Sequence, residues 1–194
     1  MKRILITTVT AYLLAVVAFG LLAVAAFGQT SEVGQRAENQ QGRIAQGVSS
    51  GQLTARETAN LETKEAAVHQ EVRADRALND GHLTGQEKGI VNQQQNNLSK
   101  QVYQDKHNAA TQHYGNNEVD QRRADQQSRI ANGVASGKLS AGQTARLEKN
   151  ETAINHETHA DRAANGSHLT GAEKQQINRQ QNQASRQIYR AKHS

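Results

Sequence analysis

The sequence predicts an all-α protein made of two tandem three-helix units, and three observations lead to this fold class. Most of the chain is one unit written twice, with an offset of 86 residues. Within each copy, apolar residues recur at spacings of three, four and seven, as they do on one face of a helix. Short capped turns containing Gly-x-Leu-Thr or a close variant separate the apolar segments, so the elementary unit is helix, turn, helix.

The duplication needs no gap along its length. The segment Arg43-Ile44-Ala45 recurs as residues 129–131, and His82-Leu83-Thr84-Gly85 recurs as residues 168–171. A fixed internal period of this kind is typical of stacked supersecondary units. We therefore expect a leader at residues 1–28, copy one at 29–107, a linker at 108–117 and copy two at 118–194. The gapless offset further predicts that each copy folds by itself.

Each copy is expected to contain three antiparallel helices with thin apolar seams. The expected helices cover residues 35–49, 54–79 and 84–108, and the same positions plus 86. In the middle helices the seam includes Glu65 and Glu151 beside Leu61 and Ile154. Tyr103 and its copy Tyr189 are expected to pack on the seam of the third helices.

The turns carry their own start signal for the following helix. Thr84 followed by Glu87 is a capping box, in which each side chain bonds the backbone N–H of the other residue. The same pattern occurs at Thr54 with Glu57, at Thr170 with Glu173 and, in conservative form, at Ser140 with Gln143. Gly51, Gly81 and Gly137 precede three of the caps and are expected to be left-handed. Ser167 replaces this Gly in the fourth turn, which predicts a shifted geometry there.

The first 28 residues have a basic start, a long apolar run and small residues near the end, as a secretory signal peptide does. Cleavage before Gln29 is expected, which predicts an exported periplasmic or secreted protein. The alternative is an inner-membrane anchor at residues 4–27, about 36 Å long as a helix and enough to span a bilayer. Contact with a membrane is expected only through this segment.

Composition excludes several classes of function. The chain has no Cys, so it has no thiolate nucleophile and no Cys-based zinc site. Its net charge of +5 is interspersed rather than gathered with aromatic residues, so we do not expect nucleic-acid binding. No nucleophile–base pattern, phosphate loop or paired-acid signature is present, which indicates a protein that is not an enzyme and needs no cofactor.

The stretch NDGHLTGQE, residues 79–87, resembles the second half of an EF-hand loop. With Gly81 at the sixth position of that loop, Glu87 falls at the twelfth and Asp80 at the fifth. Arg76 then occupies the first position, where calcium needs an oxygen, so at most weak calcium binding is expected. A second metal hypothesis rests on two His three residues apart on one helix. The candidate metal ligands are Asp80, Glu87, Glu173, His156 and His159.

The repeated stretches SGQLT, NDGHLT, NQQQNN and VYQDKH make the chain similar to bacterial exported proteins with tandem, degenerate EF-hand-like repeats. The Leu-Thr-x-x-Glu turns more weakly resemble the Leu-Thr-x-x-Gln motif of helical periplasmic proteins. These resemblances imply export and a helical fold, but no activity. We expect a structural or binding protein of the cell envelope with an unidentified envelope partner. The alternatives are a metal-ion binder and a holdase-like periplasmic chaperone.

Overall fold

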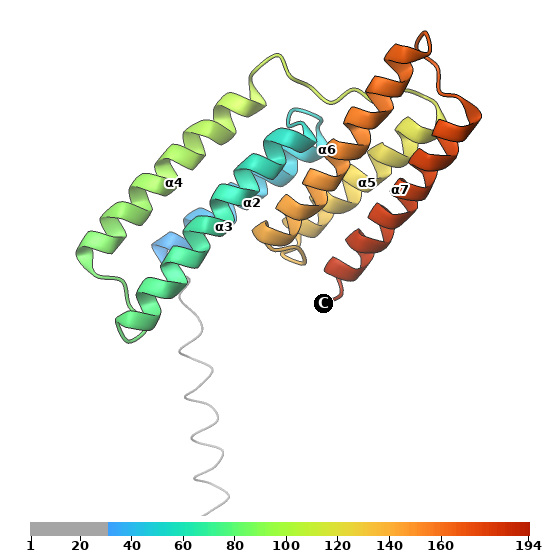
Figure 1. Cartoon of the computed structure of the whole chain (residues 1–194). Helices are drawn as coiled ribbons and strands as arrows, with labels where there is room; N and C mark the ends of the chain where they lie inside the picture. The colour runs from blue at the N-terminus through green and yellow to red at the C-terminus, as the bar shows by residue number, and fades with distance from the viewer. Residues whose placement is uncertain (1–30) are drawn as a thin grey trace, which may run out of the picture. The chain divides into compact units, whose positions relative to one another are not determined.

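A computed structural model describes residues 31–194, and the predicted leader lies outside this range. The described chain is helical and contains no strand, which confirms the all-α class. Its helices are α2 (Glu32–Ser49), α3 (Ala55–Leu78), α4 (Gly85–Lys106), α5 (Glu118–Ala135), α6 (Ala141–Ala164) and α7 (Gly171–Ala191) (Figure 1). From residue 31 onwards, no helix is long and apolar enough to cross a membrane. We refer to α2–α4 as copy one and to α5–α7 as copy two.

The four predicted capping boxes start α3, α4, α6 and α7. At α4, the Thr84 hydroxyl accepts from the Glu87 N–H at 3.3 Å, and the Glu87 carboxylate accepts from the Thr84 N–H at 2.7 Å. These contacts satisfy two N–H groups that a helix start would otherwise leave without a partner. The start of each of these helices is therefore determined locally.

The geometry of the fourth turn is not shifted, contrary to the expectation from its Ser. Gly51, Gly81 and Gly137 are left-handed as predicted. The turn before α4 has two successive left-handed residues, Asp80 with φ of 51° and Gly81 with φ of 86°. The turn before α7 repeats this with Gly166 at 61° and Ser167 at 73°. The two turns share one backbone path, and the Gly has only changed place within it.

The core does not divide at the boundary between the copies. One buried cluster contains Ile44, Leu61 and Val102 of copy one together with Ala131 of copy two. A second contains residues of copy two, including Leu147 and Ile188, together with Ala45 of copy one. Residues 36–194 accordingly form one compact unit that includes both copies.

The middle helices α3 and α6 join the copies. They pack side by side and run in opposite directions near the centre of Figure 1. Both helices are buried on more than one face, because each also packs on helices of its own copy. The expectation that each copy folds alone is untested, but the continuous core argues against it.

Polar contacts attach α4 to α2 and α7 to α5. The buried Gln40 side chain donates to the Gln95 carbonyl at 2.7 Å, and Gln126 donates to the Gln181 carbonyl at 2.7 Å. Because each pair is repeated after 86 residues, the two outer helices have the same register in both copies. Directional bonds of this kind define a register more sharply than apolar contacts do.

Candidate functional site

Four glutamates are buried where α3 and α6 meet. Glu62, Glu65 and Glu148 have no exposed surface, and Glu151 is 1% exposed. Glu148 is the copy of Glu62, and Glu151 is the copy of Glu65, at the same offset of 86 residues. Buried carboxyl groups are rare unless they are paired with a partner. We call these four residues the carboxyl cluster.

Few donors reach the carboxyl cluster. Gln41 of α2 donates to Glu62 at 2.9 Å, and Gln127 of α5 donates to Glu148 at 2.8 Å. The remaining oxygens have no hydrogen-bond partner among residues 31–194, apart from one Glu65 oxygen that lies 3.2 Å from His69 Nε2. For Glu62, Glu148 and Glu151, this lack of donors favours the neutral carboxyl group over the carboxylate.

Burial raises the pKa values of three members of the cluster. The pKa of Glu62 rises to about 8 and that of Glu151 to about 7. The pKa of Glu148 is raised well above its usual range, first by burial and then by the neighbouring Glu151 and Glu62. The electrostatic coupling between Glu62 and Glu148 places a carboxyl pair at the junction of the two copies.

The two ends of the carboxyl cluster have different neighbours. Next to Glu65 lies His69, whose side chain is 47% exposed. Tyr114 and Arg123 lie next to Glu148 and Glu151. Burial raises the pKa of Glu151, and the positive charge of Arg123 offsets part of this rise. The Arg123 guanidinium lies 5.1 Å from the centre of the Tyr114 ring, within range of a cation–π interaction. Copy two therefore closes its end of the cluster, while copy one leaves a half-exposed imidazole.

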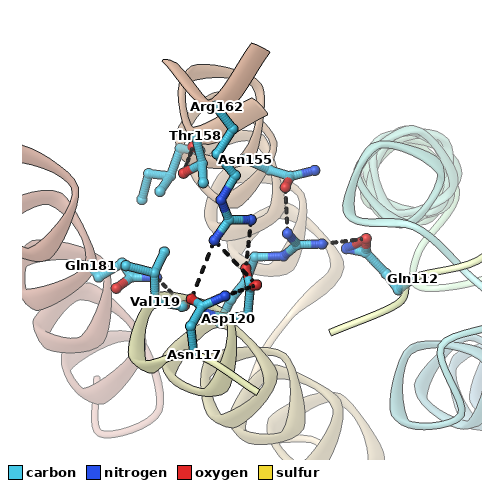
Figure 2. A network of polar contacts seen from close by, with 10 residues as sticks. Gln112, Asn117, Val119, Asp120, Asn155, Thr158, Arg162 and Gln181 are labelled. Atoms are coloured by element: carbon cyan, nitrogen blue, oxygen red, sulfur yellow. Dashed lines mark hydrogen bonds and ion pairs between the residues drawn. The ribbon is translucent and has the colours of Figure 1, made fainter. Parts of the chain in front are cut away.

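Arg123 is held by the polar network shown in Figure 2. It donates to the Asn155 side chain and, at 2.8 Å, to the Gln112 side chain. The backbone N–H of Gln112 donates to the Gly51 carbonyl at 2.8 Å in a turn of copy one. The loop between α4 and α5, residues 107–117, is thus bonded to both copies. We call this loop the strap.

A bidentate ion pair completes the network. Arg162 donates to the two Asp120 oxygens at 3.1 and 3.2 Å and to Asn117 at 3.2 Å (Figure 2). Asp120 is 6% exposed, and its carboxylate also accepts a hydrogen bond from the side chain of Asn117, the residue that caps α5. Arg162 would occupy the first position of the EF-hand-like loop in copy two, and here its charge is used to hold α6 to α5.

The predicted metal ligands in the turns are occupied by other contacts. Asn79 donates to both Glu87 oxygens at 2.9 and 3.1 Å, and Asn165 does the same for Glu173 at 2.9 and 3.0 Å. The Thr84 backbone, and then the side chains of Thr84 and Asn79, lower the pKa of Glu87. Both carboxylates therefore serve as acceptors for the turn, and Asp80 is exposed beside the first of them.

The histidine pair is likewise not assembled with other ligands. His156 and His159 are both exposed on α6. Within residues 31–194, no group of three or more His, Asp or Glu side chains is arranged to hold a metal ion. This holds for the carboxyl cluster as well, whose four acids are not arranged as a metal site.

Two exposed aromatic pairs form the other repeated surface feature. Tyr103 stacks on His107 with ring centres 4.2 Å apart, and Tyr189 stacks on His193 at the same distance. Each His Nδ1 lies 2.7 Å from the carbonyl of its Tyr, which orients the imidazole. The expectation that these Tyr pack on the seam is wrong, because they are 59% and 60% exposed and Val102 and Ile188 hold the seam instead. We call them the Tyr–His stacks.

Sequence reasoning missed half of the carboxyl cluster. It placed Glu65 and Glu151 on the seam, but it assigned no position to Glu62 and Glu148. The available signal was that Leu61-Glu62 recurs as Leu147-Glu148 and that Ala55 and Ala59 precede it on one side of the helix. Small residues flanking a repeated acid indicate a second helix contact.

Comparison with known proteins adds no assignment, since no protein-family model, curated protein or solved structure matches the chain.

Proposed function

We propose that this chain is an exported, non-enzymatic helical protein of the bacterial cell envelope that binds a polar partner through the two Tyr–His stacks. The observation that carries the proposal is the repetition of one ordered aromatic pair, 4.2 Å between ring centres, at the ends of α4 and α7. An exposed Tyr offers a large ring face and a hydroxyl at a small entropic cost, which suits recognition.

The surroundings of the stacks support a polar partner. Tyr103 follows the amide-rich stretch NQQQNNLSKQ, and Tyr189 follows NRQQNQASRQ. Amide side chains both donate and accept hydrogen bonds, so they match a partner rich in amide or hydroxyl groups. Two equivalent sites on one body further allow bivalent attachment, which raises the overall affinity without any new contact.

A binding experiment with envelope extract tests this proposal. Tyr103→Ala and Tyr189→Ala should each weaken retention of the protein on envelope material in a cosedimentation assay, and the double variant should lose more than both singles combined. Lys100→Ala and Arg186→Ala, exposed residues on the same helices, serve as controls. Equal retention of the double variant and the unchanged protein would remove the stacks from the proposal.

Export is tested separately from binding. The basic, apolar and small residues of positions 1–28 predict processing, so N-terminal sequencing of the envelope or secreted protein should start between Ala26 and Thr30. A protein that still begins at Met1 and sediments with membranes would replace the signal peptide by the anchor. If the anchor is retained, the binding assay uses residues 29–194, so that sedimentation reports the stacks and not the anchor.

The metal alternative has a quantitative test of its own. Calcium needs about six to eight oxygen ligands, whereas Glu87 and Glu173 already accept bonds from Asn and Thr donors. Isothermal titration should therefore show no calcium site tighter than about 0.1 mM. A micromolar site abolished by Glu87→Ala would restore the ion-binding function.

The chaperone alternative lacks a surface to support it. Among the described residues, the exposed large hydrophobic side chains are Leu78, Ile90 and the two Tyr of the stacks. Holdases need a contiguous apolar patch, which isolated side chains do not provide. This observation favours binding of a folded or polymeric polar partner over capture of unfolded chains.

A further inference from the structure

The carboxyl cluster lies where the two copies meet, and its role is independent of the proposed binding function. Glu62 and Glu65 belong to α3 of copy one, and Glu148 and Glu151 belong to α6 of copy two. Glu62 and Glu148 interact across this contact, so separating α3 from α6 would part the two carboxyl groups. The state of these acids and the contact between the copies are therefore linked.

The neighbours of the cluster on each packed element offer little positive charge. The strap contributes Tyr114, α5 contributes Arg123 and α3 contributes His69, while α2 and α5 otherwise present the neutral amides of Gln41 and Gln127. Arg123 is the one strong cation, and it acts on Glu151. Among residues 31–194, no cation acts comparably on Glu62 or Glu148, and these two groups repel each other when both are charged.

Protonated and ionised forms of the cluster fit this environment very differently. A neutral carboxyl group carries an O–H donor, so neighbouring acids can bond each other and use oxygens that otherwise lack partners. An ionised pair has acceptors alone, in a site that excludes water. The closed contact of α3 with α6 is thus built for the protonated cluster.

We propose that Glu62 and Glu148 form a proton-dependent latch between the two copies, closed when the pair is protonated and loosened when it is ionised. Protons move only between these carboxyl groups and solvent water, and His69 beside Glu65 offers a half-exposed route at one end. The strap at residues 107–117 keeps the copies connected when the latch loosens.

The direction of the pH effect follows from the sign of the shifts. A carboxyl group whose pKa is raised in the closed form holds its proton more tightly there than in water, where the value is 4.5. The closed form is favoured fully below about pH 4.5, and this advantage is lost as the pH rises to about 8, the closed-form pKa of Glu62. Over that range the ratio of open to closed protein should rise about tenfold per pH unit for each proton released.

Spin-label distances in the whole protein test the latch directly. The chain has no Cys, so Ala67→Cys on α3 and Ala153→Cys on α6, both exposed, place one label on each copy. The latch predicts one narrow distance at pH 5 and a growing second, longer population between pH 6 and pH 9. The pair Glu62→Gln and Glu148→Gln, which mimics the protonated acids, should keep the narrow distance at every pH.

Two controls keep the outcome decisive. Glu38→Gln with Asp125→Asn removes the same charge from exposed positions, and it should behave as the unchanged protein does. Urea unfolding of the same samples reports global stability across the pH range. A single narrow distance up to pH 9, or a change in distance that coincides with global unfolding and persists in the Gln pair, would overturn the proposal.

Discussion

Copy one and copy two follow the same backbone plan, but they differ where the strap meets α5 and α6. Copy two has Asp120, Arg123 and Asn155 in the polar network, whereas the equivalent positions of copy one are Gly34, Ala37 and His69. The capping box of the third helix and the buried acids are the same in both copies. The buried acids are therefore common to both copies, whereas the side chains of the polar network occur only in copy two, next to the strap.

Separating the two copies is expected to have the largest effect on the fold. A fragment ending at residue 107 exposes the face of α3 that packs on α6, including Ala59 and Glu62. Equivalent residues meet at this contact, so the face is close to self-complementary, as in a two-fold dimer. We expect the fragment to fold only as a dimer, with a melting temperature that rises with concentration in circular dichroism.

A concentration-independent, cooperative melt of a monomeric fragment would contradict this and support independent copies. The control is the same fragment with Glu62→Gln, which keeps the shape of the face and removes the ionisable group. If proton binding at this face matters, the Gln fragment should dimerise more tightly at pH 8 than the unchanged fragment.

The next largest effect is expected from the ion pair found only in copy two. Asp120→Ala removes a bidentate acceptor from Arg162 and an acceptor from the side chain of Asn117, which caps α5, and it should lower the free energy of unfolding by about 2–3 kcal/mol. The matched change in copy one, Gly34→Ala, removes no partner and favours the helix by up to about 1 kcal/mol. Urea unfolding measures both, and equal losses would show that the network contributes nothing specific.

One closely packed glycine in each copy is expected to give equal effects in the two copies when it is replaced. A Cβ at Gly47 would lie 2.6 Å from Leu53 Cδ1, and a Cβ at Gly133 would lie 2.6 Å from Leu139 Cδ1. Each Leu is buried, so Gly47→Ala and Gly133→Ala should each cost about 1–3 kcal/mol in urea unfolding. Gly42→Ala, where a Cβ meets nothing within 4 Å, should instead stabilise α2.

The smallest effects concern the turns. Thr84→Ala and Thr170→Ala each remove a helix cap, and each should cost about 1 kcal/mol with or without calcium. Thermal unfolding in the presence of calcium or a chelator measures this, with the exposed Gln86→Ala as a control. A loss that appears only with calcium would assign Thr84 to an ion site instead of a cap.

The parts of the fold that depend on neighbouring residues were predictable from sequence. Capping boxes need only a Thr and a Glu three positions apart, so the starts of α4 and α7 were found correctly. The left-handed Ser167 was missed, because a Gly beside it suggested that the unusual backbone would stay at the Gly. The turn accepts the Gly at either of its two left-handed positions.

The parts that depend on which helices pair were not predictable. Apolar periodicity marks one buried face, whereas α3 and α6 bury a second face lined by Ala and Glu62 or Glu148. A burial pattern made of small and acidic residues has no hydrophobic signal. Tyr103 shows the reverse case, since an aromatic residue next to the seam residue Val102 points to solvent.

The bonds between Asn165 and Glu173 can be lost slowly by deamidation of Asn165. Asn165 is followed by Gly166, whose backbone nitrogen is not shielded by a side chain and can attack the Asn side-chain carbonyl, which releases ammonia and forms a cyclic imide that water then opens. The product is a carboxylate where an amide donated at 2.9 and 3.0 Å, so ageing would set two negative groups against each other. Asn79 is followed by Asp80, whose side chain slows this reaction. Copy two should therefore lose its Asn165–Glu173 bonds before copy one loses the bonds between Asn79 and Glu87.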